Sequence, residues 1–112
     1  MYNRSVHAIN SAELPHSLPA EAGPYRVADY FAWPDDPRCE LWRGYRVLTA
    51  APRVRHQLIV GALYIALSRF TRTSGGRTIL SPTDVVLADD TVVQPDVLLL
   101  REENVGRAVN WV

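Results

Sequence analysis

Hydrophobic residues recur at helical spacing along one long segment, residues 52–74. Two adjacent rows of apolar side chains run through it, with Leu58, Ala62, Ala66 and Phe70 in one row and Ile59, Leu63 and Leu67 in the other. Two such rows are typical of an amphipathic helix that packs a wide apolar face on a sheet. Pro52 suits the first helical turn, and Gly75-Gly76 suits the C-terminal stop.

Shorter patterns before this segment predict a helix and a hairpin. Apolar residues spaced three and four apart in residues 25–33 indicate a short amphipathic helix, which Pro34 closes. Residues 39–48 alternate in part, and the alternation breaks at Arg43-Gly44 before it resumes. Because glycine can adopt the positive φ of a tight turn, we expect two strands joined there.

The apolar run at residues 97–100 is headed by a single carboxylate, Asp96. An uninterrupted apolar run of this length is typical of a strand covered on both faces, and we take it as the organising strand of the fold. An acid at the mouth of a buried strand is a common place for chemistry in open α/β sheets. The alternative is that Asp96 only stops the strand or caps a turn after Pro95.

Further strands are predicted at residues 78–80 and 84–87, with a turn at Asp89-Asp90. Residues 1–23 show no clear period and are interpreted as a mobile leader. His7 and His16 lie in this leader, where solvated histidines are commoner than metal ligands.

Composition narrows the choice of function. A chain of 112 residues with 47% hydrophobic residues is one small domain or a piece of a larger one. The formal net charge is zero, so no global field draws the chain to nucleic acid or membrane. All the basic residues are arginine, so no lysine amine is available for Schiff-base chemistry.

Cys39 is the only cysteine, which excludes an internal disulfide and, with scattered histidines, gives no zinc-ligand spacing. A reducing, cytoplasmic setting is therefore expected. No apolar run is long enough to cross a bilayer, so no membrane partner is expected.

Two groups of charged residues are candidates for a site. Glu40 heads the first strand of the predicted hairpin, although it could simply be an exposed carboxylate paired with a nearby arginine. Arg53, Arg55 and His56 lie at the start of the long helix, near the positive end of its dipole. Cations there disfavour the helix by a few tenths of a kcal/mol each, which points to anion binding; the alternative is solvated surface charge.

The order of these segments resembles the N-terminal half of the Uma (Uma-two) family, which is described as a family of putative restriction endonucleases. The residues that carry the resemblance are 25–33, Glu40–Gly44, Pro52–Gln57, Ser81–Val85 and Asp90–Asp96. The resemblance implies an α/β (α+β) fold of the PD-(D/E)XK superfamily: a restriction-endonuclease-like three-layer core, with a mixed sheet and flanking helices. Residues 24–112 would be the N-terminal part of that domain.

The resemblance also implies a site. Asp96 would be the first metal-binding acid of the nuclease motif, and Glu40 is the best candidate for a second acid. The ion would be Mg²⁺ (or Mn²⁺), a hard cation that carboxylates, waters and phosphate oxygens hold. Arg53, Arg55 and His56 would face the phosphate backbone of DNA.

Departures from the family pattern matter as well. In the family, a strand that carries the second motif acid comes later than Val112, and an acid commonly stands where this chain has Tyr45. We therefore expect an incomplete, inactive fragment, truncated at the C-terminus. A non-catalytic nucleic-acid or protein-binding module and a non-functional broken reading frame are the alternatives. An unpaired apolar edge at residues 97–100 would also favour self-association.

Overall fold

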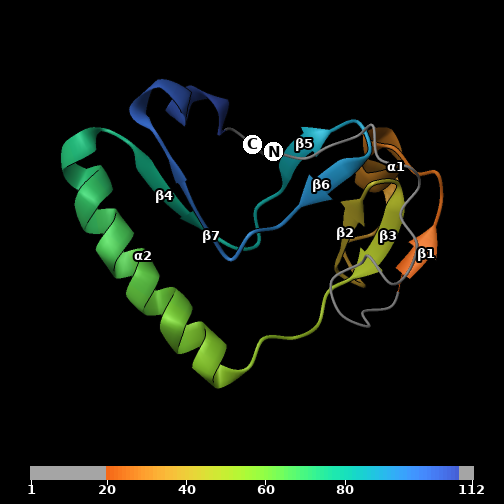
Figure 1. Cartoon of the computed structure of the whole chain (residues 1–112), viewed down its shortest axis with the longest axis horizontal. Helices are drawn as coiled ribbons and strands as arrows, with labels where there is room; N and C mark the ends of the chain where they lie inside the picture. The colour runs from red at the N-terminus through yellow and green to blue at the C-terminus, as the bar shows by residue number, and fades with distance from the viewer. Residues whose placement is uncertain (1–19, 109–112) are drawn as a thin grey trace. The chain divides into compact units, whose positions relative to one another are not determined.

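A computed structural model describes residues 20–108 of the protein (Figure 1). Most of the predicted leader, with His7 and His16, lies outside the described residues. The described elements are β1 (Ala20–Ala22), α1 (Val27–Ala32), β2 (Cys39–Trp42), β3 (Tyr45–Leu48), α2 (Val54–Ser74), β4 (Arg77–Leu80), β5 (Val85–Ala88), β6 (Thr91–Val93), β7 (Val97–Leu100) and the 3-10 helix η2 (Glu102–Arg107). The α+β class predicted from the sequence is confirmed.

The chain divides into two compact units. The first unit runs to Ala50 and takes in Ala88–Val92, while the second holds Ala51–Leu87 and the chain from Val93 onward. The prediction that residues 24–112 are the N-terminal part of one restriction-endonuclease-like domain stays a prediction.

The five-stranded sheet has the order β1-β3-β2-β6-β5. β3 pairs with both β1 and β2, and β2 also pairs with β6. These three pairings are antiparallel, and so is the pairing of β4 with β7. The predicted mixed sheet requires a parallel pair, and none of these four pairings is parallel. Strand β1 falls within residues 1–23, which are interpreted as a leader because its pairing with β3 depends on backbone groups and not on a hydrophobic pattern.

The hairpin between β2 and β3 has the predicted turn. Trp42 pairs with Tyr45, and the two residues between them both have positive φ, 51° at Arg43 and 87° at Gly44. Two successive positive φ values make a type I′ turn, whose twist matches that of the strands. The Arg43 backbone N–H donates to Thr91 Oγ1 at 3.3 Å, so the turn is also tied to β6.

The first unit has a small core between the strands and α1. Leu41 and Val92 are fully buried and face each other across the β2–β6 pair. Val47 of β3 is buried as well. The Tyr30 hydroxyl of α1 donates to the Cys39 carbonyl at 3.2 Å, which satisfies a buried polar group and fixes the helix on β2.

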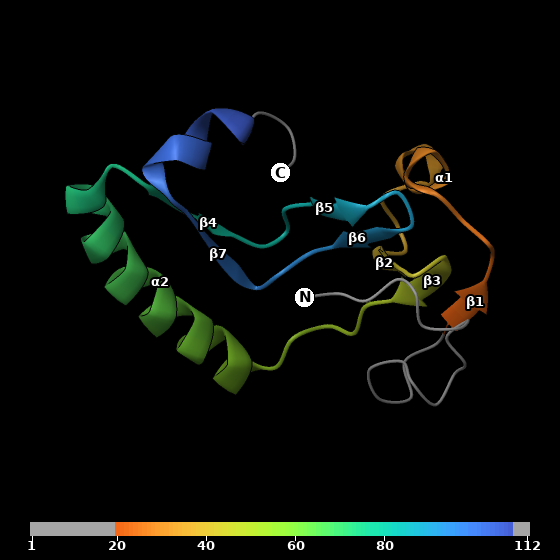
Figure 2. The same cartoon turned by 45° about the horizontal axis from the view of Figure 1, so that its top comes forward.

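α2 dominates the second unit and lies beside β4 and β7 (Figures 1 and 2). Arg53 is its N-cap residue, so Pro52 precedes the helix instead of occupying the first turn. Gly75 ends the helix in the left-handed conformation, with φ 80°, and its N–H donates to the Thr71 carbonyl. The predicted glycine stop is confirmed.

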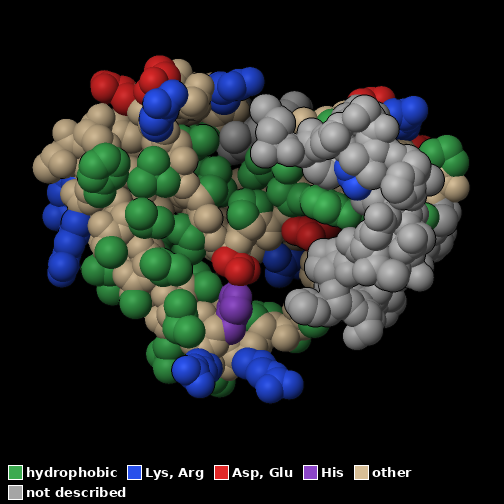
Figure 3. Space-filling model, viewed as in Figure 1, with side chains coloured by type: hydrophobic (Ala, Val, Ile, Leu, Met, Phe, Trp, Pro, Cys, Tyr) green, Lys and Arg blue, Asp and Glu red, His purple; other side chains and the backbone are tan. Residues whose placement is uncertain are grey.

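The apolar rows predicted to pack on the sheet are mostly exposed. Leu58 is 70% exposed and Phe70 is 59% exposed, and green side chains cover the visible face of α2 in Figure 3. The face that is covered carries Thr71, which is buried, and half-buried Tyr64. The prediction that the two apolar rows pack on the sheet is therefore wrong. The side of α2 that faces β4 carries both polar and apolar side chains, and there Thr71 Oγ1 lies 3.1 Å from Thr78 Oγ1.

The second sheet pairs β4 with β7, in a register that runs from Arg77 opposite Leu100 to Leu80 opposite Val97. The predicted strand at 97–100 is confirmed, but only Leu100 is buried, and its other residues are half-buried. The sheet has two strands, so less of β7 is covered than an apolar run suggests. No helix among residues 20–108 is long and apolar enough to cross a membrane.

Candidate active site

Asp96 lies immediately before β7, and its side chain is 60% exposed. Its Oδ2 atom lies 3.0 Å from Nε2 of His56, in the first turn of α2. The His56 side chain is 42% exposed, so the pair lies at the surface. The structure thus brings together two of the residues that the sequence singled out, one from each of two separate segments.

His56 is held from both sides of its ring. Nε2 faces Asp96, and Nδ1 lies 3.0 Å from Oε1 of Gln57. Both partner atoms are oxygens that accept, so the ring satisfies both only when both nitrogens carry a proton. The hydrogen bond to Gln57, and then the hydrogen bond and charge of Asp96, raise the pKa of His56 above its ordinary value.

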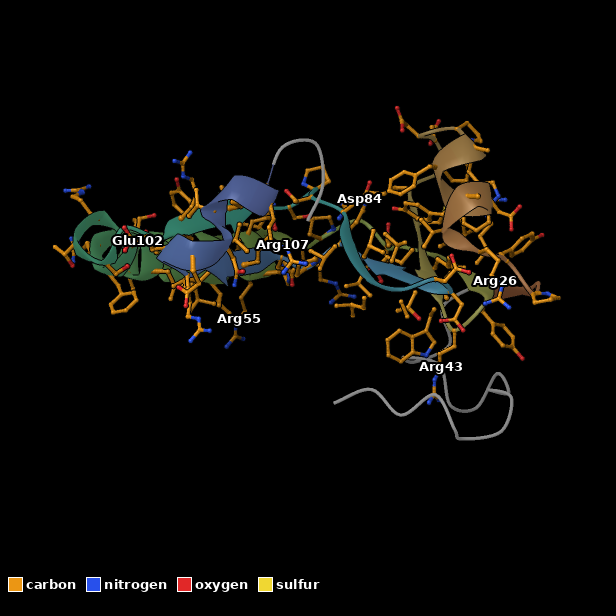
Figure 4. All side chains as sticks on the ribbon, turned by 90° about the horizontal axis from the view of Figure 1, so that it is seen from above. Arg26, Arg43, Arg55, Asp84, Glu102 and Arg107 are labelled. Carbon is orange, nitrogen blue, oxygen red and sulfur yellow. The ribbon has the colours of Figure 1, made fainter. Side chains whose placement is uncertain are left out.

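Two further contacts hold the backbone around Asp96. The Ser81 N–H donates to the Asp96 carbonyl at 3.1 Å. Gln94 Nε2 donates to Asp84 Oδ1 at 2.9 Å, which joins the segment after β4 to the segment before β7. Figure 4 labels Asp84 on the stretch between β4 and β5. Sequence reasoning assigned Asp84 and Gln94 no role, although both lie in segments that carry the family resemblance.

The start of α2 presents positive charge. Arg53 and Arg55 are exposed, and the first turn contains no acidic residue to balance them. Arg55 extends outward from the helix in Figure 4. Backbone N–H groups and the helix dipole favour anions at such an end. The prediction that Arg53, Arg55 and His56 contact the phosphate backbone of DNA stays a prediction.

Glu40 belongs to the other unit. It is a half-buried residue of β2 that pairs with Val47 of β3. Asp96 belongs to the second unit, whereas Glu40 belongs to the first. The prediction that the two acids share one metal site therefore stays a prediction.

The chemistry of the donors decides whether a divalent cation fits. Among residues 20–108, no group of three or more His, Cys, Asp or Glu side chains is placed to hold a metal ion. Asp96 offers an exposed carboxylate, and Mg²⁺ commonly binds through one or two carboxylates while waters and substrate phosphates complete its shell. The described residues thus fit an open cation site anchored on Asp96, and they do not fit a closed protein cage.

Comparison with known proteins places the chain in a family. None of the curated proteins compared with the chain matches it. A family model matches residues 27–111, a range that includes Glu40, the start of α2 and Asp96. The chain therefore belongs to the Uma2 family, which is described as "putative restriction endonuclease".

Proposed function

We propose that this protein is a metal-dependent endonuclease of the Uma2 type, which acts on DNA phosphodiesters through a cation anchored on Asp96. Family membership supports the reaction class. The observation that carries the choice of residue is the exposed Asp96 carboxylate, held against His56 at the start of α2. A bound Mg²⁺ or Mn²⁺ ion would polarise the scissile phosphate and lower the pKa of a bound water.

The chain's own groups have distinct parts in this proposal. Asp96 supplies the carboxylate that a hard cation prefers. The protonated form of His56 donates from Nε2 to Asp96, and the hydrogen bonds to Gln57 and Asp96 favour that form by raising the pKa of His56. With the Asp96 carboxylate holding a cation, the Nε2 proton of His56 would be available to a phosphate oxygen or to the departing oxygen. Glu40, a residue of β2, is proposed as the second metal-binding acid.

Arg53 and Arg55 are proposed to contact the DNA backbone. Both are exposed at a helix N-terminus, where backbone amides add to the positive field. Such contacts position a nuclease on DNA without reading its sequence. They would bring a phosphate toward the same end of α2 that carries His56.

Calorimetry with Mn²⁺ tests the role of Asp96. The comparison uses the wild-type chain, Asp96→Asn and a matched control, Asp89→Asn. Asp89 is a similarly exposed acid, with 69% side-chain exposure, and it lies in the turn between β5 and β6. We expect Mn²⁺ heats for wild type and the control and their loss in Asp96→Asn. Equal heats for all three proteins would remove Asp96 from the site.

The exposed arginines also favour a second function, a DNA-binding module without cleavage. In that case affinity for duplex DNA falls with rising salt, and Arg53→Ala/Arg55→Ala lowers the salt slope by roughly one per lost phosphate contact. Arg72→Ala is the matched control, because Arg72 is an exposed arginine in the last turn of the same helix. An affinity that does not depend on salt would exclude phosphate contacts.

Self-association through a sheet edge is proposed as well. β4 and β7 form a two-stranded sheet, so each strand has a paired edge and an edge with no strand partner within the described sheet. Unpaired edges of apolar strands recruit other chains. Light scattering on the purified chain should give a mass above that of the monomer, and a monodisperse monomer would contradict the proposal.

A further inference from the structure

The segments that carry Asp96 and Asp84 are tied together by a second link beyond the strand ladder. We propose that Gln94 and Asp84 are positioning residues, whose hydrogen bond sets the place of Asp96 for cation binding. This inference rests on the proposed role of Asp96. Gln94 and Asp84 contact each other at 2.9 Å and are both half-buried, so water competes less for this bond than at an exposed site.

The strand pairs of the β4–β7 ladder end close to Asp96. Extending the register past Leu80 and Val97 sets Ser81 opposite Asp96, and the Ser81 N–H does donate to the Asp96 carbonyl. The next opposed residues would be Pro82 and Pro95. This pair follows the hydrogen-bonded pair of Ser81 and Asp96, so it occupies a non-hydrogen-bonded position of the antiparallel pattern, where no N–H group points at the partner strand. The assigned strand pairs end at Leu80 and Val97, and the Ser81–Asp96 bond lies directly beyond them.

The Gln94–Asp84 bond lies on the other side of these prolines. Gln94 precedes Pro95, and Asp84 follows Pro82 by one intervening residue, Thr83. The side-chain bond thus joins the two segments beyond the last assigned strand pair. Its acceptor is a carboxylate, which makes it stronger than a bond between neutral groups.

The two links together bracket Asp96. The ladder fixes its carbonyl through Ser81, and Gln94 restrains the chain two residues earlier. A restrained backbone limits the directions that the Asp96 side chain can take, and the observed direction brings Oδ2 to His56 at the start of α2. Loss of the bond should leave the fold in place and loosen Asp96, which weakens cation binding.

The test uses the full chain and two measurements, Mn²⁺ affinity by calorimetry and hydrogen exchange of the Ser81 amide. Gln94→Met keeps the side-chain length and removes the donor. We expect a loss of Mn²⁺ affinity of about fivefold and faster Ser81 exchange by a similar factor, the size of effect expected from one hydrogen bond. Asp84→Asn keeps an acceptor oxygen but removes the charge, so its Mn²⁺ affinity should lie between those of wild type and Gln94→Met.

Thr83→Val is the matched control in the same segment, since Thr83 Oγ1 donates to the Leu80 carbonyl and is no part of the Gln94–Asp84 link. It should leave Mn²⁺ affinity unchanged. In a double-mutant cycle, Asp84→Ala and Gln94→Met should not be additive, because they break one bond. Should Gln94→Met fail to fold by circular dichroism, Asp84→Ala takes its place with the same expected result.

Two outcomes separate this inference from the function on which it rests. If wild type binds Mn²⁺ and a folded Gln94→Met chain binds it equally well, the positioning role is overturned while the site survives. If wild type itself shows no Mn²⁺ binding, the proposed function fails and takes the inference with it. Weaker binding by Gln94→Met with an unchanged melting temperature supports positioning over a purely structural role.

Discussion

His56 and Asp96 are 40 positions apart in the chain, yet Nε2 of one lies 3.0 Å from Oδ2 of the other. The packing of α2 beside β4 and β7 produces this contact, because it brings the start of the helix to the start of β7. Because this hydrogen-bonded pair joins two elements, its presence in solution would show that α2 packs beside β7.

The titration of His56 should show this pair in solution. Both Gln57 and Asp96 raise the pKa of His56, so an NMR titration should place it above the ordinary value near 6.5. Asp96→Asn should lower the pKa toward that value, since it removes the negative charge. A His56 pKa that is the same in both proteins would show that the side chains do not meet.

The raised pKa of His56 also predicts how the stability of the protein changes with pH. Because the pKa of His56 is raised in the folded state, its stabilising contribution is fully present below the unfolded pKa and is lost as pH rises through the folded pKa. Chemical denaturation of wild type should therefore show a stability term that declines across this window. His56→Gln should lack it, and an identical pH dependence in the two proteins would contradict the assignment.

Alanine substitutions at Gly75 and Gly61 should change the free energy of unfolding in opposite directions. Gly75 has φ 80°, and an added Cβ would meet the Glu102 carboxyl carbon at 2.7 Å, so Gly75→Ala should cost about 1–2 kcal/mol. Gly61 lies inside α2 with nothing within 4 Å of an added Cβ, so Gly61→Ala should stabilise by about 0.5–1 kcal/mol. Urea denaturation measures both, and equal effects of the two changes would refute the helix end described for α2.

Leu41 and Leu58 test which leucines form the core. Leu41 is fully buried in β2, and Leu41→Ala should cost about 2–5 kcal/mol. Leu58 is 70% exposed on α2, and Leu58→Ala should change the free energy of unfolding by less than about 0.5 kcal/mol. A large cost at Leu58, measured by urea denaturation, would mean that the apolar rows of α2 are covered in solution.

Thr71 should be a sensitive position on the covered face of α2. Its Oγ1 donates to the Ser68 carbonyl and lies 3.1 Å from Thr78 Oγ1, while the residue is only 7% exposed. Thr71→Val should cost about 1 kcal/mol, because it leaves the Thr78 hydroxyl short of a partner. Thr73→Val is the control: Thr73 makes the same kind of bond to Phe70 at an exposed position, where water can replace it. Equal thermal shifts in the two variants would contradict the packing of this face.

Local patterns in the sequence were enough for most of the elements. The glycine at position 75 predicted the end of α2, and Arg43-Gly44 predicted the hairpin turn, because both depend on the backbone freedom of single residues. The apolar run after Asp96 predicted β7. Strand β1 left no such trace, because Ala20–Ala22 is defined by its backbone pairing with β3.

The sequence by itself determined where most of the helices and strands fall and the family of the chain, and it singled out Asp96 as a candidate, because these depend on local conformation and on residue order. Tertiary structure alone decided which face of α2 is covered, since a helix with apolar residues on several faces can dock in more than one rotation. It also decided that His56 meets Asp96 and that Gln94 holds Asp84. The first contact joins residues 40 positions apart and the second joins residues 10 positions apart, and the packing of the elements brings these atoms within hydrogen-bonding distance.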